Sequence, residues 1–288
     1  MAAIAKSVKA GRSRRGVRRT GEDWAVDIFV YSGAALIFIA TFYPFFLSIV
    51  LALNEGKDAA RGGIYFYPRA FTLENFKMFL IDPKWILSLQ ITIGRTLLGT
   101  ALTTLFTAFA AYGLSDRALV GRKLYLSMII IAMYFSGGVI PYYALLRSVR
   151  LINTFWVYVI PGMMSIFYCL VSISFFQSIP HEVPESARID GAGELRIFAR
   201  IALPLGAPGI ASLFILSFLD NWNLIEQPMT FLRVESEQPL SLFLRRIGEG
   251  NVDVAMAASI LTLLPTLLLF FYCESYLVEG IQLSGLKE

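Results

Sequence analysis

The sequence has very few of the residues from which catalytic and metal sites are usually built. Its 288 residues include one histidine, His181, and two cysteines, Cys169 and Cys273. A single histidine excludes a metal site made of several imidazoles, and the cysteines lack metal-ligand spacing. Both cysteines lie within apolar runs, where small buried thiols are expected. We therefore expect no catalytic residues and no metal site in this chain.

Charge is also scarce. Only 16% of the residues are charged and 56% are hydrophobic, and the mean hydropathy is +0.63. Soluble domains carry about a quarter charged residues. So few charges cannot coat the surface of a soluble chain of this length. The composition excludes a soluble enzyme, a disulfide scaffold and a disordered chain, and it predicts a protein embedded in lipid.

The apolar residues are grouped into about six runs, each near the twenty or so residues that a spanning helix needs. The runs are Ile28–Leu53, Ile86–Leu114, Leu124–Leu146, Phe155–Ser178, Pro208–Ile225 and Val254–Val278. Several contain proline, and Gly137, Gly138 and Pro141 are expected to break or bend the third. We predict an all-α integral membrane protein with about six transmembrane helices.

Basic residues are concentrated before the first run, in a tail over residues 1–27. A basic arm can bind nucleic acid, but in a chain this apolar it fits anionic lipid headgroups better. We expect lipid and no nucleic acid as its partner. The excess of lysine and arginine places the N-terminus in the cytoplasm, and an even number of spans places the C-terminus there too.

Ionisable residues inside membrane spans are costly and usually functional. Here they are Arg95 in the second run, Asp220 near the end of the fifth and Glu274 near the end of the sixth. Arg95 either lines a polar cavity or extends toward the membrane interface. No carboxylate is expected at mid-depth, which argues against an ion-coupled carrier. Any transport energy then comes from outside this chain.

The segment Val183–Gly209 predicts a helix–turn–helix elbow in the cytoplasm. Pro184 suits a first helical position, Gly191 suits a helix end, and a second helix is expected from Glu194 to just before Pro204. Its apolar face is expected to comprise Leu195, Phe198, Ala199 and Ala202. Such an elbow is either an interfacial loop or a plug that fits a socket on another protein.

The spacing in this elbow follows the pattern E-A-A-x3-G-x9-I-x-L-P. The matching residues are Glu185, Ser186, Ala187, Gly191, Ile201, Leu203 and Pro204, with Ser186 replacing the second alanine. This resembles the coupling loop, here residues 180–206, of inner-membrane permeases of binding-protein-dependent ABC importers. Three further segments resemble the carbohydrate branch of this family, and especially its maltose-type second permease. They are residues 68–76, Asn221-Trp222-Asn223 and residues 276–287. The usual Gln-Arg before Tyr276 is Glu274-Ser275 here.

The resemblance implies a type I ABC importer permease fold over residues 28–288. It implies four kinds of partner: a second homologous permease, two ATPase subunits, a periplasmic or extracellular binding protein and a saccharide. The chain would be no enzyme and hold no cofactor, with ATP and Mg bound by the partners. No G-x4-G-K-[ST] motif occurs. The location implied is the inner membrane of a bacterium.

The two permeases of such an importer are expected to form a heterodimer with one shared pathway, and the ATPases to lie below it in the cytoplasm. Within this resemblance, Glu185, Ala187 and Gly191 shape the coupling helix and its turn. Ile201, Leu203 and Pro204 anchor that helix to the fifth run.

Polar and aromatic residues near the end of the fifth run and in the third are candidates for the substrate path. They are Asp220, Asn221, Trp222, Asn223, Tyr142, Tyr143 and Arg95. Instead of lining the path, the first four residues could cap the helix and pack on the outer loop. The tyrosines could instead lie at the lipid interface. Resemblance to the alginate importer makes an acidic oligosaccharide one candidate substrate, while neutral oligosaccharides are as well supported.

Four other interpretations compete with this one. A permease for another solute would keep the elbow, and an ion-coupled secondary transporter would work without nucleotide. A membrane-bound transferase would need clustered His, Asp and Glu at one interface, and the sequence shows none. A purely structural anchor would leave the elbow spacing without a role.

Overall fold

The computed structural model describes residues 21–59, 61–64, 66–234 and 238–285. Within these residues the regular structure is helical, apart from one isolated bridge between Asn54 and Phe71. The predicted all-α class is therefore confirmed. Most of the basic tail, residues 1–20, and the last three residues lie outside the described part.

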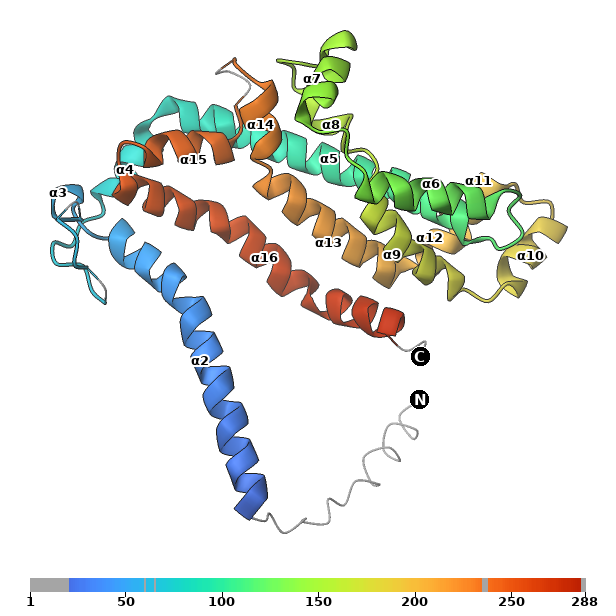
Figure 1. The fold of residues 1–288 in the computed structure, drawn as a ribbon, viewed down its shortest axis with the longest axis horizontal. Helices are drawn as coiled ribbons and strands as arrows, with labels where there is room; N and C mark the ends of the chain where they lie inside the picture. Colours follow the sequence, from blue (N-terminus) through green and yellow to red (C-terminus); the bar gives the residue numbers. More distant parts are fainter. Residues whose placement is uncertain (1–20, 60, 65, 235–237, 286–288) are drawn as a thin grey trace.

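Three helices are long and apolar enough to cross a membrane without a break. They are α2 (Gly21–Ala52), α5 (Pro83–Ser115) and α16 (Val252–Gly285). At 1.5 Å per residue, α5 is about 50 Å long. Figure 1 shows α5 and α16 running the length of the molecule, with α2 diverging from them. These three confirm the first, second and sixth apolar runs.

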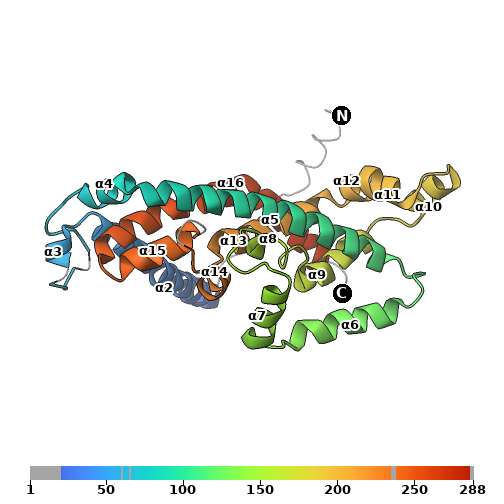
Figure 2. The same cartoon turned by 90° about the horizontal axis from the view of Figure 1, so that it is seen from above.

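The third apolar run is not one span. It forms α6 (Arg122–Tyr134) and α7 (Val139–Ser148), which meet at an angle of 112°. The bend occurs at residues 135–138, where Gly138 has a φ of +81° that other residues rarely adopt. The glycines therefore break the run as expected, whereas Pro141 lies inside α7. Figure 2 shows α7 standing away from α5.

The fourth apolar run is also interrupted, which corrects the expectation of a continuous helix over Phe155–Ser178. A short helix, α8 (Trp156–Val159), is followed by six non-helical residues and then by α9 (Ile166–Gln177). Pro161 and Gly162 lie in the break, where proline removes a backbone donor. The twelve residues of α9 cover only about 18 Å.

The fifth apolar run forms a helix that stops short. This helix, α13 (Ala207–Asn223), has 17 residues, or about 25 Å. It is preceded by the elbow and followed by two short helices. Their bounds are α14 (Glu226–Phe231) and α15 (Leu240–Gly248). Two more short helices, α3 (Gly56–Ala59) and α4 (Glu74–Ile81), precede α5.

The interior is built around α5, which packs against α13, α9 and α15. The largest cluster of buried side chains joins α5, α9 and α13 near the elbow, and it includes Cys169. Cys169 is thus the buried thiol that the sequence predicts, whereas Cys273 is only half-buried. Helices α13 and α9 approach each other closely at Gly209 of α13, because a Cβ at this position would lie 2.5 Å from the Phe175 ring of α9.

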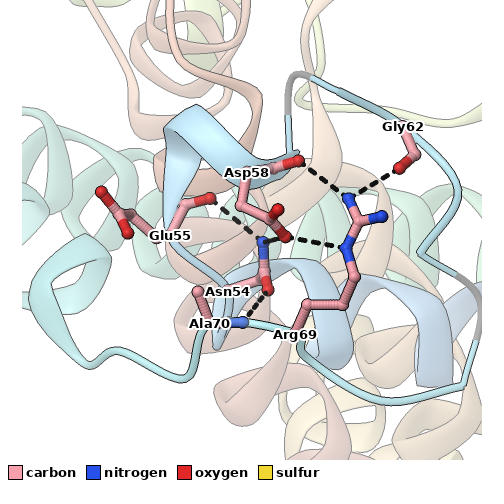
Figure 3. Close-up of polar contacts among 6 residues, drawn as sticks. All are labelled: Asn54, Glu55, Asp58, Gly62, Arg69 and Ala70. Carbon is pink, nitrogen blue, oxygen red and sulfur yellow. Dashed lines mark hydrogen bonds and ion pairs between the residues drawn. The ribbon is translucent and has the colours of Figure 1, made fainter.

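The loop between α2 and α4 is held by a polar clamp (Figure 3), and Figure 1 shows this loop at the opposite end of the molecule from the elbow. The Asn54 amide donates to Asp58 and accepts from the Ala70 N–H, and Arg69 donates to Asp58 and to the Gly62 carbonyl. The Asn54 amide, with Arg69 beside it, holds the pKa of Asp58 below its usual value. The clamp gives a rigid shape to a loop that has almost no regular structure.

The close packing at Gly209 predicts that Gly209→Ala destabilises the protein. The added methyl group overlaps the Phe175 ring, and overpacking of this kind costs about 1–3 kcal/mol. The matched control is Gly113→Ala on α5, where a Cβ meets nothing within 4 Å. Thermal unfolding in detergent should show a lower midpoint for Gly209→Ala only. Equal midpoints for the two variants would contradict the packing described here.

Candidate functional site

The elbow projects beyond the end of the helix bundle. Its first helix, α10 (Glu182–Ile189), has no buried residues, and Figure 1 shows it at the extreme end of the molecule. Glu185 and Ser186 are exposed, Ala187 is half-buried, and Ile189 is 82% exposed. The whole of α10 is therefore accessible from outside the bundle.

The turn after α10 depends on Gly191. Its φ of +81° lies in the left-handed region, and the Ala192 N–H donates to the Ala187 carbonyl at 2.9 Å. This is the glycine-terminated helix end that the sequence predicts. One detail is corrected: α10 begins at Glu182, so Pro184 is its third residue and not its first.

An ion pair closes the elbow. Arg188 of α10 donates to both carboxylate oxygens of Glu194, at 2.6 and 3.2 Å, across the Gly191 turn. The Tyr112 hydroxyl of α5 donates to the same carboxylate at 3.3 Å, and Asp116 lies 4.0 Å from Arg188. The hydrogen bond from Arg188 lowers the pKa of Glu194 and raises that of Arg188. The elbow is thereby tied to α5.

The second half of the elbow is one continuous helical path through Pro204, which corrects the expected end before that residue. Its parts are α11 (Glu194–Ile197), the π-helix η1 (Phe198–Ala202) and α12 (Leu203–Leu205). Pro204 is tolerated because it follows the wide turn of η1 at the start of α12. The path then turns by 86° into α13.

The π-helix changes which side chains face the bundle. Phe198 and Ala202 are buried as predicted, but Leu195 is 69% exposed and Ala199 is also exposed. Ile197 takes their place in the interior. A π-helix has a wider turn than an α-helix, so the α-helical spacing used for the prediction fails across it. Ile201 and Leu203 are half-buried and Pro204 is exposed.

The apolar face of this second half packs on the bundle through aromatic rings. The Phe198 ring contacts the rings of Phe109 and Tyr112 on α5 and of Phe176 on α9. Buried aromatic contacts of this type add about 0.5–1.5 kcal/mol each beyond area burial. The second half of the elbow is therefore packed directly on α5 and α9.

The candidate path residues of α13 do not form a single surface. Asp220 is exposed and accepts a hydrogen bond from the Tyr168 hydroxyl of α9 at 2.5 Å. Asn221 lies against Gly99 of α5, and Asn223 is exposed. Trp222 is buried, donates to the Thr262 carbonyl of α16 and stacks on Phe218. Trp222 therefore packs within the bundle.

The end of α13 lies level with the middle of α5. Asn221 lies against Gly99, the middle residue of the 33-residue α5. Asp220, the preceding residue, therefore lies near the middle of α5, and α13 ends there instead of following the rest of α5.

Arg95 neither lines a cavity nor extends to an interface. It is fully buried, and its guanidinium donates to the backbone carbonyls of Trp222 and Leu224 at 3.4 and 2.9 Å. The guanidinium carbon lies 5.2 Å from the centroid of the Tyr158 ring. Arg95 therefore satisfies carbonyls at the end of α13 that have no helical partner. Its Nε and Nη1 atoms have no partner among the described residues.

Tyr142 and Tyr143 lie on α7 and contact the ring of Phe231 at the end of α14. Both are half-buried in an aromatic cluster with α8. Sequence reasoning missed two contacts: the Arg188–Glu194 pair and the hydrogen bond from the Tyr168 hydroxyl to Asp220. Each joins residues from separate helices or across a turn, which hydrophobic periodicity does not report.

Comparison with known proteins identifies a family. The model described as "Binding-protein-dependent transport system inner membrane component" matches residues 28–282. Protein LplC of Bacillus subtilis (strain 168) is 30% identical, over 86% of this chain and 90% of its own. The polygalacturonan/rhamnogalacturonan transport system permease protein YtcP of the same organism is 26% identical, over 91% and 98%.

A relative from Halalkalibacterium halodurans, the arabinooligosaccharides transport system permease protein AraQ, is 28% identical over 88% of this chain and 94% of its own. The crystal structure of a bacterial ABC transporter involved in the import of the acidic polysaccharide alginate contains a similar chain. Its TM-score is 0.83 at 23% identity, and the match covers 90% of this chain and 98% of that one. This likeness shows the fold.

The Arg188–Glu194 pair predicts that Arg188→Gln and Glu194→Gln each loosen the turn and that the double variant is no looser than either. An exposed ion pair stabilises the closed turn by up to about 1 kcal/mol. In either single variant the Ala192 amide hydrogen should therefore exchange with solvent up to about fivefold faster. Because the pKa of Glu194 is lowered, the contribution is present at neutral pH and is lost as the pH falls through that lowered value. Hydrogen exchange of the purified protein measures both effects. The control is Arg196→Gln, and additive single effects would contradict a direct pair.

Proposed function

Because this chain belongs to the family of binding-protein-dependent transport system inner membrane components, we propose that it is one permease subunit of an ATP-driven carbohydrate importer. It is a multi-pass membrane permease and not an enzyme. The observation that carries the proposal is the exposed elbow, which carries the family spacing and is tied to the bundle by an ion pair and aromatic contacts.

The substrate class is supported by the relatives. YtcP is named for polygalacturonan and rhamnogalacturonan, and AraQ for arabinooligosaccharides. The chain aligns with nearly the full length of both. These proteins share carbohydrate as the transported class while differing in the charge of the sugar. We therefore propose an oligo- or polysaccharide as the substrate.

The proposed assembly contains a second homologous permease as a heterodimeric partner, two ATPase subunits and a binding protein outside the membrane. ATP and Mg are held by the ATPases. The assembly lies in the cytoplasmic membrane of a bacterium, with both termini of this chain in the cytoplasm. The elbow then faces the ATPases, in agreement with its position at one end of the bundle.

The geometry supports a lever mechanism. An ATPase that grips α10 through Glu185, Ser186 and Ala187 pulls on a rigid body, because Gly191, Arg188 and Glu194 fix the turn. The motion passes through Phe198 to α5 and α9, and through the 86° turn at Gly206 to α13. Alternating access then follows from movement of α13 and α9 against the partner permease.

The assembly is tested by isolating the chain from its native membrane. We expect a second permease and an ATPase to copurify, and uptake of saccharide by reconstituted vesicles to require ATP. Uptake of a different solute would keep the permease assignment and remove the carbohydrate one. Transport that persists without nucleotide would favour an ion-coupled secondary transporter, to which the Asp220 carboxylate beside the middle of α5 would then be relevant.

The coupling role predicts that Gly191→Ala uncouples ATP hydrolysis from transport. At a φ of +81° an added Cβ costs about 1–2 kcal/mol, so the turn and the direction of α10 change. Gly193→Ala is the matched control, because its Cβ also meets nothing within 4 Å and its φ is −72°. Uptake per ATP hydrolysed by the purified complex should fall only for Gly191→Ala. Equal uptake for the two variants would show that the turn does not set the coupling.

A further inference from the structure

A cavity lies where three interrupted elements meet at the middle of the bundle. Its volume is about 260 Å³, and it is lined by the break between α8 and α9, by the end of α13 and by the start of α14. Thr103 of α5, four residues from the helix centre, forms part of its wall. The cavity thus lies beside the middle of a long apolar helix, and inside a bilayer non-helical backbone is tolerated only if it is buried or lines a cavity.

The polar groups around this cavity include two side-chain acceptors, in Gln227 and Asp220. The Gln227 Oε1 atom is buried and has no hydrogen-bond partner among the described residues. Asp220 offers a carboxylate, one oxygen of which accepts from the Tyr168 hydroxyl. The Thr103 hydroxyl donates to the Gly162 carbonyl at 2.6 Å. A buried acceptor without a donor is costly, so a ligand that brings hydroxyl donors gains by filling the site.

The walls of the cavity combine these acceptors with aromatic surface. Tyr158 and Tyr168 both line it, and Arg95 lies against the Tyr158 ring outside the lining. Aromatic walls with a few polar groups are typical of sites for small organic ligands. The volume equals that of about nine water molecules at about 30 Å³ each, which suits one sugar ring and not a longer chain.

The charge of the lining distinguishes between kinds of saccharide. Asp220 carries the only full charge among the lining residues, and no lysine or arginine lines the cavity. An anionic sugar placed there would bring a second carboxylate close to the first, and like charges at short range are unfavourable. Sugar hydroxyls, in contrast, donate to Asp220 and Gln227.

We propose that this cavity is a subsite for a single neutral, hydroxyl-bearing sugar ring, with Asp220 and Gln227 as its acceptors, and that it disfavours a uronic acid at this position. The proposal rests on the proposed carbohydrate transport. Tyr168 is a positioning residue, because it holds the carboxylate of Asp220 in place. The subsite adds to this chain a part in substrate selection, beyond forming half of a pathway.

The experiment compares uptake of a neutral and a uronic-acid disaccharide by the complete complex in vesicles, each at saturating loaded binding protein. Asp220→Asn replaces an acceptor with an amide that also donates, so the ratio of neutral to acidic uptake should fall about tenfold, as for loss of a hydrogen bond to a charged group. Tyr168→Phe should raise the half-saturating concentration of the neutral sugar with little change in the maximal rate. Leu216→Ala, exposed on the same helix and outside the cavity lining, is the control and should match the wild type.

The outcomes separate the two proposals. If the wild-type complex imports no saccharide, the proposed function fails. If it imports saccharides but prefers the acidic one, or if Asp220→Asn leaves the ratio unchanged in an assembled complex, the subsite is overturned while carbohydrate transport stands. A fallen ratio together with the Tyr168→Phe effect supports the subsite.

Discussion

The donation of the Arg95 guanidinium to the last carbonyls of α13 is the interaction on which the centre of this molecule depends. A helix that ends inside a bilayer leaves carbonyl groups that neither water nor lipid can satisfy. Arg95 supplies donors there, and the Tyr158 ring lies beside its charge. Because α13 can stop at this depth, α14 and the break before α9 can approach it and enclose a cavity. A continuous fifth span would leave no room for one.

The same constraint links the cavity to the elbow. α13 begins at the 86° turn that follows the elbow and ends at the cavity, so it has one end at each site. The π-helix η1 sets the faces of the elbow that meet α5 and α9, and α9 carries Tyr168 to the cavity. A displacement of the elbow therefore reaches both walls of the cavity through short, packed helices and needs no long-range deformation.

Sequence patterns predicted the elements that depend on local chemistry. The long apolar runs gave α2, α5 and α16, and Gly191 marked the turn of the elbow, because helix length and left-handed backbone are local properties. The patterns did not predict features that depend on contacts between residues far apart in the chain or on an irregular helix. The end of α13 is fixed by Arg95, about 130 residues away in the chain, and the π-helix overrides the spacing that had placed Leu195 in the interior. Hydropathy records neither effect.

The packing of α2 has a consequence for synthesis. Its main contact is with α16, the last helix of the chain, and little of its apolar surface is buried elsewhere in the described structure. About 200 residues separate the end of α2 from the start of α16. At roughly 5–20 residues per second, the ribosome needs on the order of 10–40 s to make them. The first helix must therefore remain in the bilayer, alone or beside an insertion factor, until translation of its partner is complete.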